Sequence, residues 1–316
     1  MENYRATIKE INEEQEKTRN FEMFNDGGIV YIPKKTGAIT VVGDIHGDSL
    51  TVEQIINKTG FIENMEEGDR SQILVFMGDY VDRGPAEKRV MEILLELKKR
   101  YPKNVFLMGA DHVTTEGKVN PQSFPQTIKS GYDTEEHGIK IFGKYVKIFG
   151  LMPSLVVCGN GLVISHGGIC AETIPQGLLS LRRNFRAFYQ MQWADPDPGL
   201  TQGIGGNGDR IESGSDEEAL NAGLILYSEE ALRSFLGKIG GKVMIRGHQV
   251  SSEVRGGKPN SFSTNILWTI HSTGKGSSES YYGKMGREKD PCFAQFGMDE
   301  SITEIDPNKH IKKVWL

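Results

Sequence analysis

Short apolar runs recur along the chain, and five of them stop where a block of Gly, Asp and His residues begins. Their length and composition are typical of buried strands. We expect each polar block to lie at the carboxyl end of a strand, where the loops of a layered α/β protein converge. The runs are Ile39–Val42, Ile73–Met77, Val105–Met108, Leu162–Ile164 and Val243–Ile245.

Helical patterns separate the first three runs. Apolar residues recur at helical spacing over Leu50–Ile62, before an acidic turn at Glu63–Asp69, and again over Glu87–Lys99. Strands and helices therefore alternate in this part of the chain. Such alternation predicts a parallel sheet covered by helices.

The rest of the chain is predicted to mix helices, loops and short strands. Helices are expected over Pro175–Tyr189 and Glu217–Leu236, with a Gly- and Asp-rich loop at Pro198–Ser215 between them. The last part of the chain is predicted to form short strands at Ile266–Ile270, Cys292–Phe296, Ile302–Ile305 and Ile311–Leu316.

Length and composition favour one large domain with a small N-terminal appendage. A chain of 316 residues, 37% of them hydrophobic, can bury a large core. Met1 to about Asn25 is rich in Glu, Lys and Asn and has a few apolar positions, which predicts a short docking helix. We place the helical appendage at residues 1–36 and the main domain at residues 37–316.

Net charge and cysteine content argue against several classes of protein. The formal net charge of −5 provides no basic surface for nucleic acid. Three cysteines without paired spacing argue against a disulfide framework and a structural zinc site. No apolar run approaches the ~20 residues that span a bilayer, and the N-terminus lacks a hydrophobic signal core. We expect a soluble, cytoplasmic protein that binds neither nucleic acid nor membrane.

The polar blocks together contain four Asp and four His residues. Glycine beside most blocks allows sharp turns that bring these side chains close. Mixed carboxylate and imidazole ligands suit Mn, Fe or Zn, whereas an oxygen-only set would suit Mg or Ca. We therefore expect a site for two divalent metal ions. The blocks are Gly43–Gly47 (GDIHG), Gly78–Gly84 (GDYVDRG), Gly109–His112 (GADH), Ser165–Gly168 (SHGG) and Arg246–His248 (RGH).

Six of these residues are expected to bind the ions. A carboxylate shared by two ions holds them ~3.5–4 Å apart, so that a phosphoryl group can be clamped between them. We assign that bridge to Asp79. Asp44 and His46, two residues apart at a strand end, project to the same side and complete the first ion site. The second ion is assigned to Asp111, His166 and His248.

The remaining residues of the blocks are expected to act on the substrate. His112 stands next to a ligand and can donate a proton to the leaving oxygen, with Asp82 fixing its tautomer. Arg83 offers a planar pair of donors to phosphate oxygens, which a lysine cannot reproduce.

Each block, taken alone, also has a simpler explanation. Asp44 can cap a following helix, and a single histidine after a strand is more often a satisfied neutral residue than a ligand. Asp79, Asp82 and Arg83 can form an ordinary surface ion pair. The joint occurrence of five blocks at strand ends favours the two-metal site.

The blocks resemble the signatures of the phosphoprotein phosphatase family, which includes calcineurin and the type 1 and type 2A enzymes. Gly43–Gly47 and Gly78–Gly84 match the first two signatures, and Ser165–Gly168, Trp193–Pro196 and Arg246–Gln249 match later ones. The resemblance runs from about Ile39 to the C-terminus. It implies the calcineurin-like metallophosphoesterase fold, a mixed α/β fold with a central β-sandwich flanked by helices. It also implies one-step hydrolysis of phosphoserine and phosphothreonine in proteins by a metal-bound hydroxide.

The third block departs from the family pattern. The family reads Arg-Gly-Asn-His-Glu, whereas this chain has Gly109–Val113, in which only the histidine is retained. Asp111 replaces a neutral amide with a negatively charged acceptor. It should bind metal well and repel a phosphate dianion. We expect a weakened or retuned enzyme, or an inactivated form.

Two other family positions are not matched. The family's second phosphate-binding arginine corresponds to the segment Asn221–Gly223, where no arginine stands, and Arg210 or Arg255 can take its place. The C-terminal Ser-Ala-Pro-Asn-Tyr signature is reduced to Ser272–Gly274, which leaves Tyr281 or Tyr282 as the substrate-binding tyrosine. Regulatory subunits are therefore not indicated.

Two alternatives to a protein phosphatase stay open. The chain can hydrolyse a small phosphoester or a dinucleoside polyphosphate, because related phosphoesterases share the first two signatures, although Tyr80 favours the protein phosphatases. It can also be a catalytically impaired module that binds phosphate without turnover.

Overall fold

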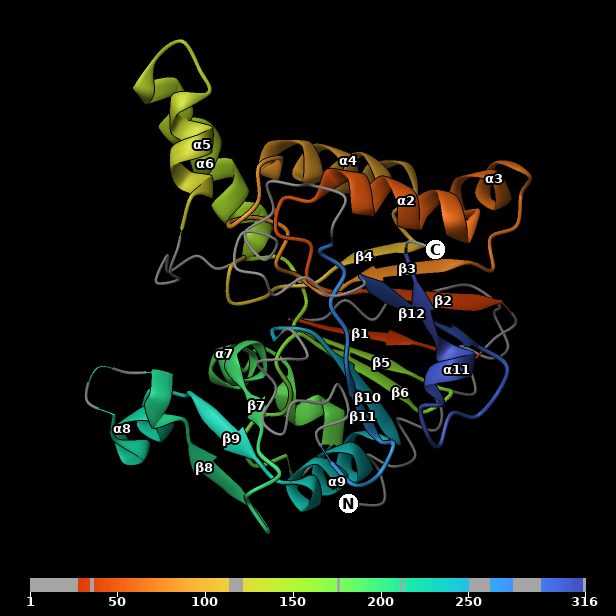
Figure 1. Ribbon diagram of the computed structural model, residues 1–316, viewed down its shortest axis with the longest axis vertical. Helices are drawn as coiled ribbons and strands as arrows, with labels where there is room; N and C mark the ends of the chain where they lie inside the picture. Colours follow the sequence, from red (N-terminus) through yellow and green to blue (C-terminus); the bar gives the residue numbers. More distant parts are fainter. Residues whose placement is uncertain are drawn as a thin grey trace.

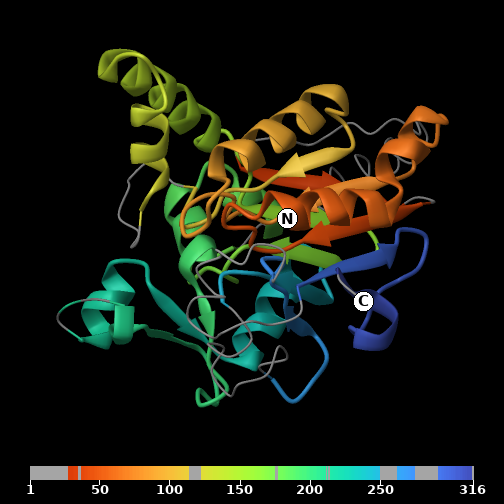
Figure 2. The same ribbon diagram turned by 45° about the horizontal axis from the view of Figure 1, so that its top comes forward.

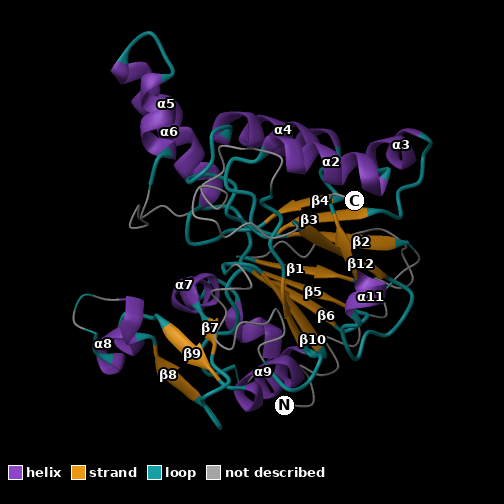
Figure 3. Cartoon of the chain, viewed as in Figure 1, coloured by secondary structure: helices purple, strands orange, loops and turns teal. Residues whose placement is uncertain are grey.

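The computed structural model describes residues 28–34, 37–113, 122–174, 177–210, 212, 214–249, 262–274 and 291–314. These residues form two five-stranded sheets and one three-stranded sheet. The two larger sheets pack face to face, and helices cover their outer faces (Figures 1 and 3). The predicted mixed α/β fold, a central β-sandwich flanked by helices, is confirmed.

The first sheet has the strand order β1-β5-β6-β10-β11. Neighbouring strands are parallel, except for the antiparallel pair of β5 and β6. The strands are β1 (Ile29–Ile32), β5 (Leu155–Cys158), β6 (Leu162–Ser165), β10 (Val243–Arg246) and β11 (Leu267–Thr269).

The second sheet has the order β13-β12-β2-β3-β4. Its parallel half, β2 (Ala38–Val42), β3 (Ile73–Phe76) and β4 (Val105–Leu107), was predicted from the alternating pattern. Helices α2 (Ser49–Thr59), α3 (Phe61–Glu66) and α4 (Glu87–Arg100) link these strands. The antiparallel half consists of β12 (Cys292–Gly297) and β13 (Ile311–Lys313), preceded by the short helix α11 (Pro307–His310).

The core between the two sheets is apolar and buried. Val41 and Val75 of the second sheet pack in one cluster with Ile164 and Ile245 of the first. Each of these strands also buries its other face under helices, which explains why the strands read as continuous apolar runs. The strand ends are therefore fixed by core packing on both faces of each sheet.

A third, smaller sheet lies beside the sandwich, with order β7-β9-β8. A pair of helices, α5 (Phe124–Ser130) and α6 (Glu135–Phe149), projects at the upper left of the molecule, above the small sheet at the lower left (Figure 2). The remaining elements are η1 (Gly177–Leu181), α7 (Phe185–Trp193), β7 (Asp195–Pro196), β8 (Ile204–Gly206), η2 (Gly208–Arg210), α8 (Asp216–Asn221), β9 (Ile225–Tyr227) and α9 (Glu229–Ile239).

Several predicted elements differ from the structure. The predicted helix Leu50–Ile62 is interrupted at Gly60, which adopts a left-handed φ of 60°. The first residues of the predicted acidic turn Glu63–Asp69 belong to helix α3, which ends at Glu66. Strand β8 and the turn η2 lie inside the predicted loop Pro198–Ser215. Strand β9 interrupts the predicted helix Glu217–Leu236, because Gly223 has a φ of 84° and an apolar run follows it.

Further differences concern the two ends of the chain and the segment after residue 174. The described part of Pro175–Tyr189 is a 3₁₀ turn followed by the start of α7. Ile302–Ile305 forms no strand, and β13 ends at Lys313. Residues 29–32 of the predicted appendage are strand β1, which pairs with β5 in the body; the predicted N-terminal helix lies outside the described residues.

Two composition-based expectations can be compared with the structure. All three cysteines lie in the described residues, and none of them forms a disulfide bond. Among the described helices, none combines the length and apolar character that a membrane span requires.

Candidate metal centre

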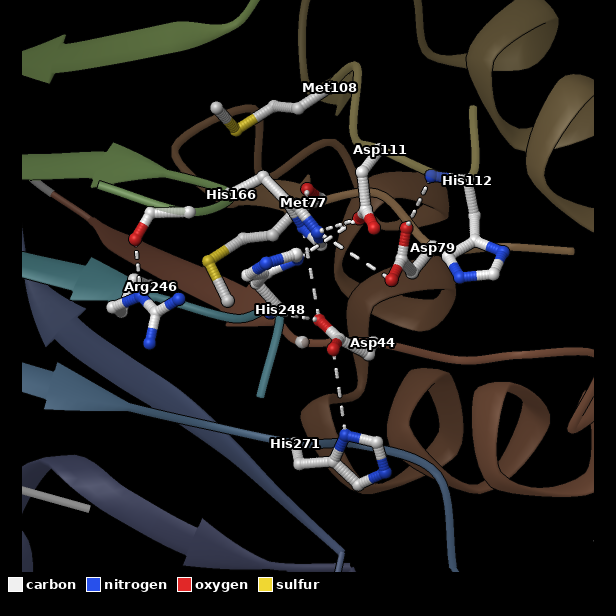
Figure 4. A network of polar contacts seen from close by, with 12 residues as sticks. Asp44, Met77, Asp79, Met108, Asp111, His112, His166, Arg246, His248 and His271 are labelled. Atoms are coloured by element: carbon white, nitrogen blue, oxygen red, sulfur yellow. Dashed lines mark hydrogen bonds and ion pairs between the residues drawn. The ribbon is translucent and has the colours of Figure 1, made fainter. Parts of the chain in front are cut away.

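The five polar blocks meet at one edge of the sandwich, as predicted. Figure 4 shows Asp44, Asp79, Asp111, His166 and His248 with their side chains directed toward one another. They follow β2, β3, β4, β6 and β10, respectively. The carboxyl ends of these strands bring together residues up to 204 positions apart in the sequence.

Asp79 occupies the middle of the cluster. Its Oδ2 atom lies 3.3 Å from His46 Nε2 and 3.5 Å from His166 Nε2, which belong to the two predicted ion sites. Its Oδ1 atom accepts a hydrogen bond from the backbone N–H of His112 at 3.2 Å. This central position is the one required of a bridging carboxylate.

The predicted second ion site is compact. Asp111 Oδ1 lies 2.9 Å from His166 Nε2 and 3.1 Å from His248 Nδ1. His166 Nδ1 lies 3.1 Å from the carbonyl oxygen of Met77 and donates to it. A ring nitrogen that is held by a carbonyl in this way leaves the other nitrogen to face a metal.

The predicted first ion site is less compact. Asp44 Oδ1 accepts a hydrogen bond from the backbone N–H of His248, and it lies 3.9 Å from His166 Nδ1. His46 Nδ1 donates to the Val81 carbonyl at 3.0 Å, so that Nε2 faces Asp79. Asp44, Asp79 and His166 offer three ligand atoms on this side that all lie within 4.8 Å of one another.

The cluster fits divalent cations. Asp44, Asp79 and Asp111 are only 1%, 1% and 3% exposed. Three adjacent carboxylates in such a place need counter-charges. Asp44 Oδ2 and His248 Nε2 are buried and have no hydrogen-bond partner within the described residues. Groups of three ligand atoms within 4.8 Å of one another are formed by Asp111, His166 and His248, by Asp44, Asp79 and His166, and by Asp79, Asp111 and His112.

Burial and the neighbouring charged groups set the protonation states of the acids and histidines in the cluster. Burial opposes ionisation of the acids, yet the neighbouring imidazoles keep the pKa values of Asp44, Asp79 and Asp111 below the ordinary range. Burial would lower the pKa of His166, but Asp79, Asp111 and Asp44 raise it to about 9. Burial lowers the pKa values of His46 and His248, which favours the neutral form that binds metal.

The simpler explanations of two blocks do not hold. The N-cap of α2 is Asp48, which accepts from the Thr51 N–H at 3.0 Å, and not Asp44. Asp79 and Asp82 are each only 1% exposed, so they do not form a surface ion pair. The predicted ligands therefore remain available to the cluster.

Backbone strain concentrates at the site. Six non-glycine residues in the described ranges have a positive φ, and five of them belong to the polar blocks. A left-handed φ is unfavourable for side chains of this type and persists only where the surroundings enforce it. The five are His46, Asp79, Asp82, Arg83 and His248.

Two glycines allow close approach of the blocks. A Cβ atom at Gly84 would overlap the backbone carbonyl of His46, and a Cβ atom at Gly247 would lie 2.2 Å from Asp44 Oδ1. Both blocks can therefore approach only because these residues lack a side chain.

His112 and Asp82 form the predicted pair. His112 Nδ1 donates to Asp82 Oδ2 at 2.8 Å. Asp82 Oδ1 accepts from the backbone N–H groups of Ser123 and Phe124, at the start of α5, at 2.8 and 2.9 Å. Burial would lower the pKa of His112, but Asp79 and Asp82 raise it. No signal in the sequence predicts this contribution of α5.

Arg246 connects its own block to the block of His166 and to Asp195, a role that the sequence did not reveal. Its guanidinium is fully buried and donates to the carbonyl of Gly167, to Gln249 Oε1 at 2.7 Å and to Asp195 Oδ1 at 3.2 Å. Gly167 follows His166, and Gln249 follows His248. Both histidines are thus positioned through Arg246.

Arg210 is the arginine that the structure brings to this region. It contacts Asp195 Oδ2 through Nε at 2.9 Å and through Nη2 at 2.7 Å. Its guanidinium carbon lies 5.8 Å from the centre of the Trp193 ring, which itself is 5.9 Å from the His248 ring. Arg255, Tyr281 and Tyr282 lie outside the described residues.

Comparison with known proteins identifies the family. Residues 37–252 match the model of the calcineurin-like phosphoesterases, and the chain belongs to this family. A probable serine/threonine-protein phosphatase of Encephalitozoon cuniculi (strain GB-M1) is 25% identical over 217 residues, which are 68% of this chain and 43% of that protein. The serine/threonine-protein phosphatase 6 catalytic subunit of Drosophila melanogaster is 28% identical over 166 residues, 50% of each chain.

The chain therefore spans half the length of these relatives or less. A solved structure of a Saccharomyces cerevisiae protein serine/threonine phosphatase, with similarity to human phosphatase PP5, matches the fold with a TM-score of 0.61. That match has 19% identity and covers 85% of this chain and 76% of the other.

The role of Arg246 can be tested by replacing it with methionine. The variant Arg246→Met leaves the carboxylate of Asp195 and the carbonyl of Gly167 without their buried donor, so the free energy of unfolding should fall by about 3–5 kcal/mol. Urea denaturation measures the change. Arg233→Met is the control, because Arg233 pairs with Glu229 on the surface and should cost about 1 kcal/mol or less. An equal loss of unfolding free energy in the two variants would contradict the proposed connecting role of Arg246.

Metal binding should depend on pH through His166. This residue carries a proton in the ion-free site below a pKa of about 9, and that proton must leave before Nε2 binds an ion. Affinity for Mn²⁺ should therefore rise as pH increases toward 9, by up to about tenfold per pH unit for each displaced proton. Calorimetry in buffers of different ionisation enthalpy at pH 7.5 measures proton release. Binding without any proton release would contradict the expectation.

Proposed function

We propose that this chain is a two-metal protein phosphatase that hydrolyses phosphoserine and phosphothreonine. The observation that carries the proposal is the His112–Asp82 pair, 2.8 Å apart, next to the buried carboxylates of Asp79 and Asp111. A proton donor beside a cation site is the combination that phosphate ester hydrolysis needs. The names of the two relatives, both serine/threonine phosphatases, support the class of substrate.

The cluster would hold two divalent ions, of Mn, Fe or Zn. Asp44 and His46 would hold one, Asp111, His166 and His248 the other, with Asp79 between them. When bound, the ions would activate a water molecule and neutralise charge on the phosphoryl group. The protein positions the ligands through the strained backbone and through Arg246.

His112 would protonate the oxygen of the departing serine or threonine. Its Nδ1–H is held by Asp82, so the ring is fixed with Nε2 as the second proton-bearing atom. The raised pKa of His112 keeps this second proton on the ring closer to neutral pH. A general acid works best when its pKa lies near the working pH.

Two arginines would bind the phosphoryl oxygens. Arg83 lies in the second block, with Nη1 3.3 Å from His46 Nε2. Arg210 is anchored on Asp195 and lies over Trp193. Planar guanidinium groups suit a phosphoryl group because each can donate two parallel hydrogen bonds.

A phosphate-binding module without turnover is the second candidate. The specific observation that favours it is Asp111, a buried carboxylate at the position where the family has a neutral amide. Its charge adds to those of Asp44 and Asp79 and opposes a phosphate dianion.

The role of His112 predicts a dependence on the leaving group. In His112→Gln, hydrolysis of a phosphoserine peptide should slow by about 10²–10⁴-fold, because the serine alkoxide needs a proton. Hydrolysis of p-nitrophenyl phosphate should slow by about tenfold or less, since nitrophenolate leaves without one. Steady-state kcat for both substrates measures the difference.

The control for this comparison is His137→Gln, which changes an exposed histidine of α6. It should leave both rates unchanged. An equal loss on both substrates in His112→Gln would mean that His112 acts through structure and not as a proton donor.

The charge of Asp111 predicts a gain of activity on its removal. Asp111→Asn should hydrolyse an aryl phosphate in the presence of Mn²⁺ at least about tenfold faster than the native chain, because it removes one negative charge near the dianion. Asp299→Asn, the same change at an exposed position, should have no effect. Metal content must be measured for all three proteins.

Activity in the Asn variant alone would identify the native chain as a binding module. Equal and measurable rates in both proteins would contradict a weakening of the enzyme by Asp111 and would establish the native chain as a working phosphatase.

A further inference from the structure

A sixth strand end reaches the metal centre, and it carries a histidine. Strand β11 is parallel to β10, so its carboxyl end lies at the same edge as the block that contains His248. His271 follows two residues after β11 and forms an isolated parallel bridge with Asp44. Figure 4 shows its ring on the side of Asp44 opposite to Asp111.

The backbone around His271 is fixed to Asp44. The carbonyl oxygen of Asp44 accepts a hydrogen bond from the Ser272 N–H at 3.1 Å and another from Thr273 Oγ1 at 2.9 Å. The Ser272 hydroxyl in turn accepts from the Gly43 N–H at 2.8 Å. These bonds join the ends of β11 and β2, and they hold the two side chains next to each other.

The side-chain geometry is that of two donors facing a common ion. His271 Nδ1 lies 3.7 Å from Asp44 Oδ2, which is too long for a hydrogen bond. Two donors that each lie ~2.1 Å from one ion are separated by roughly 3–3.6 Å at angles of 90–120°. Asp44 Oδ2 is buried without a hydrogen-bond partner in the described residues.

His46 completes the arrangement. The His46 and His271 rings are 6.5 Å apart, and the side chain of His271 is 10% exposed. His271 thus neighbours Asp44 and His46, and His46 in turn contacts Asp79. These three neighbours are the predicted ligands of the first ion. On this side, the three ligand atoms found within 4.8 Å of one another belong to Asp44, Asp79 and His166, and His166 is also a member of the group with Asp111 and His248.

We infer that His271 is a ligand of the first metal ion, which would then be held by Asp44, His46, Asp79 and His271. This inference rests on the proposed two-metal function and extends its ligand set. Two imidazoles and two carboxylates favour a borderline ion such as Mn, Fe or Zn over Mg in this site. With His271, the first ion would have four protein ligands, the same number as the second ion.

The test compares the native chain with His271→Phe, which keeps an aromatic ring and removes both nitrogens. The native chain should bind two Mn²⁺ ions, as measured by calorimetry and by elemental analysis after gel filtration. His271→Phe should bind one ion with native affinity and the other at least about a hundredfold more weakly. His310→Phe is the control, because His310 is also a buried histidine but stacks on Phe296.

A spectroscopic readout separates a ligand from a residue that only orients Asp44. In protein with ¹⁵N-labelled histidine, pulsed electron paramagnetic resonance of bound Mn²⁺ counts the coordinated imidazoles. That number should fall by one in His271→Phe and stay unchanged in His310→Phe. Weaker binding with an unchanged number of imidazoles would overturn the inference, and so would two ions bound at native affinity.

Two further measurements distinguish a folding defect, and a failure of the two-metal function, from a failure of the inference. If ion-free His271→Phe does not match the native chain in thermal unfolding, His271→Ala takes its place, and the same loss of one imidazole is expected. If the native chain itself binds fewer than two ions, the two-metal function fails first. That failure is visible before any variant is made.

Discussion

The structure depends on the burial of three carboxylates side by side. Asp44, Asp79 and Asp111 are almost completely shielded from water, and their mutual repulsion is strong in such surroundings. In the described residues, the histidines around them provide only part of the positive charge. Two divalent cations would supply what is missing. The cluster is thus a metal centre by charge balance as well as by the identity of its side chains.

The sandwich keeps this unfavourable arrangement in place. Each ligand follows a strand that is buried on both faces, so the strand ends cannot move apart without opening the core. Positive φ values at five residues of the blocks show the cost of this geometry. Arg246 adds a buried connection between the loops that carry His166 and His248.

Much of the centre could be predicted from sequence, because its signals are local. A short apolar run followed by Gly, Asp or His identifies both the strand and the ligand after it. Long-range relations could not be predicted. Asp48 and not Asp44 caps α2, and the backbone of α5, more than 40 residues away, orients Asp82. Strand β9 was hidden because its three residues follow a helical pattern and only Gly223 marks the break.

His271 also follows an apolar run, but it was not among the ligands predicted from the sequence. That run is the predicted strand Ile266–Ile270, and no glycine stands directly beside the histidine. Its proximity to Asp44 arises from the packing of one sheet on the other, and the sequence carries no record of that contact. Asp111 makes this centre differ in charge from the family pattern, which has a neutral amide at that position.

The central claim is that the buried carboxylates form a two-ion site bridged by Asp79. Diffraction from crystals grown with Mn²⁺, recorded at the manganese absorption edge, tests it most directly. Two anomalous peaks ~3.5–4 Å apart are expected, one on either side of the Asp79 carboxylate. A single peak, or none beside Asp79, would contradict it.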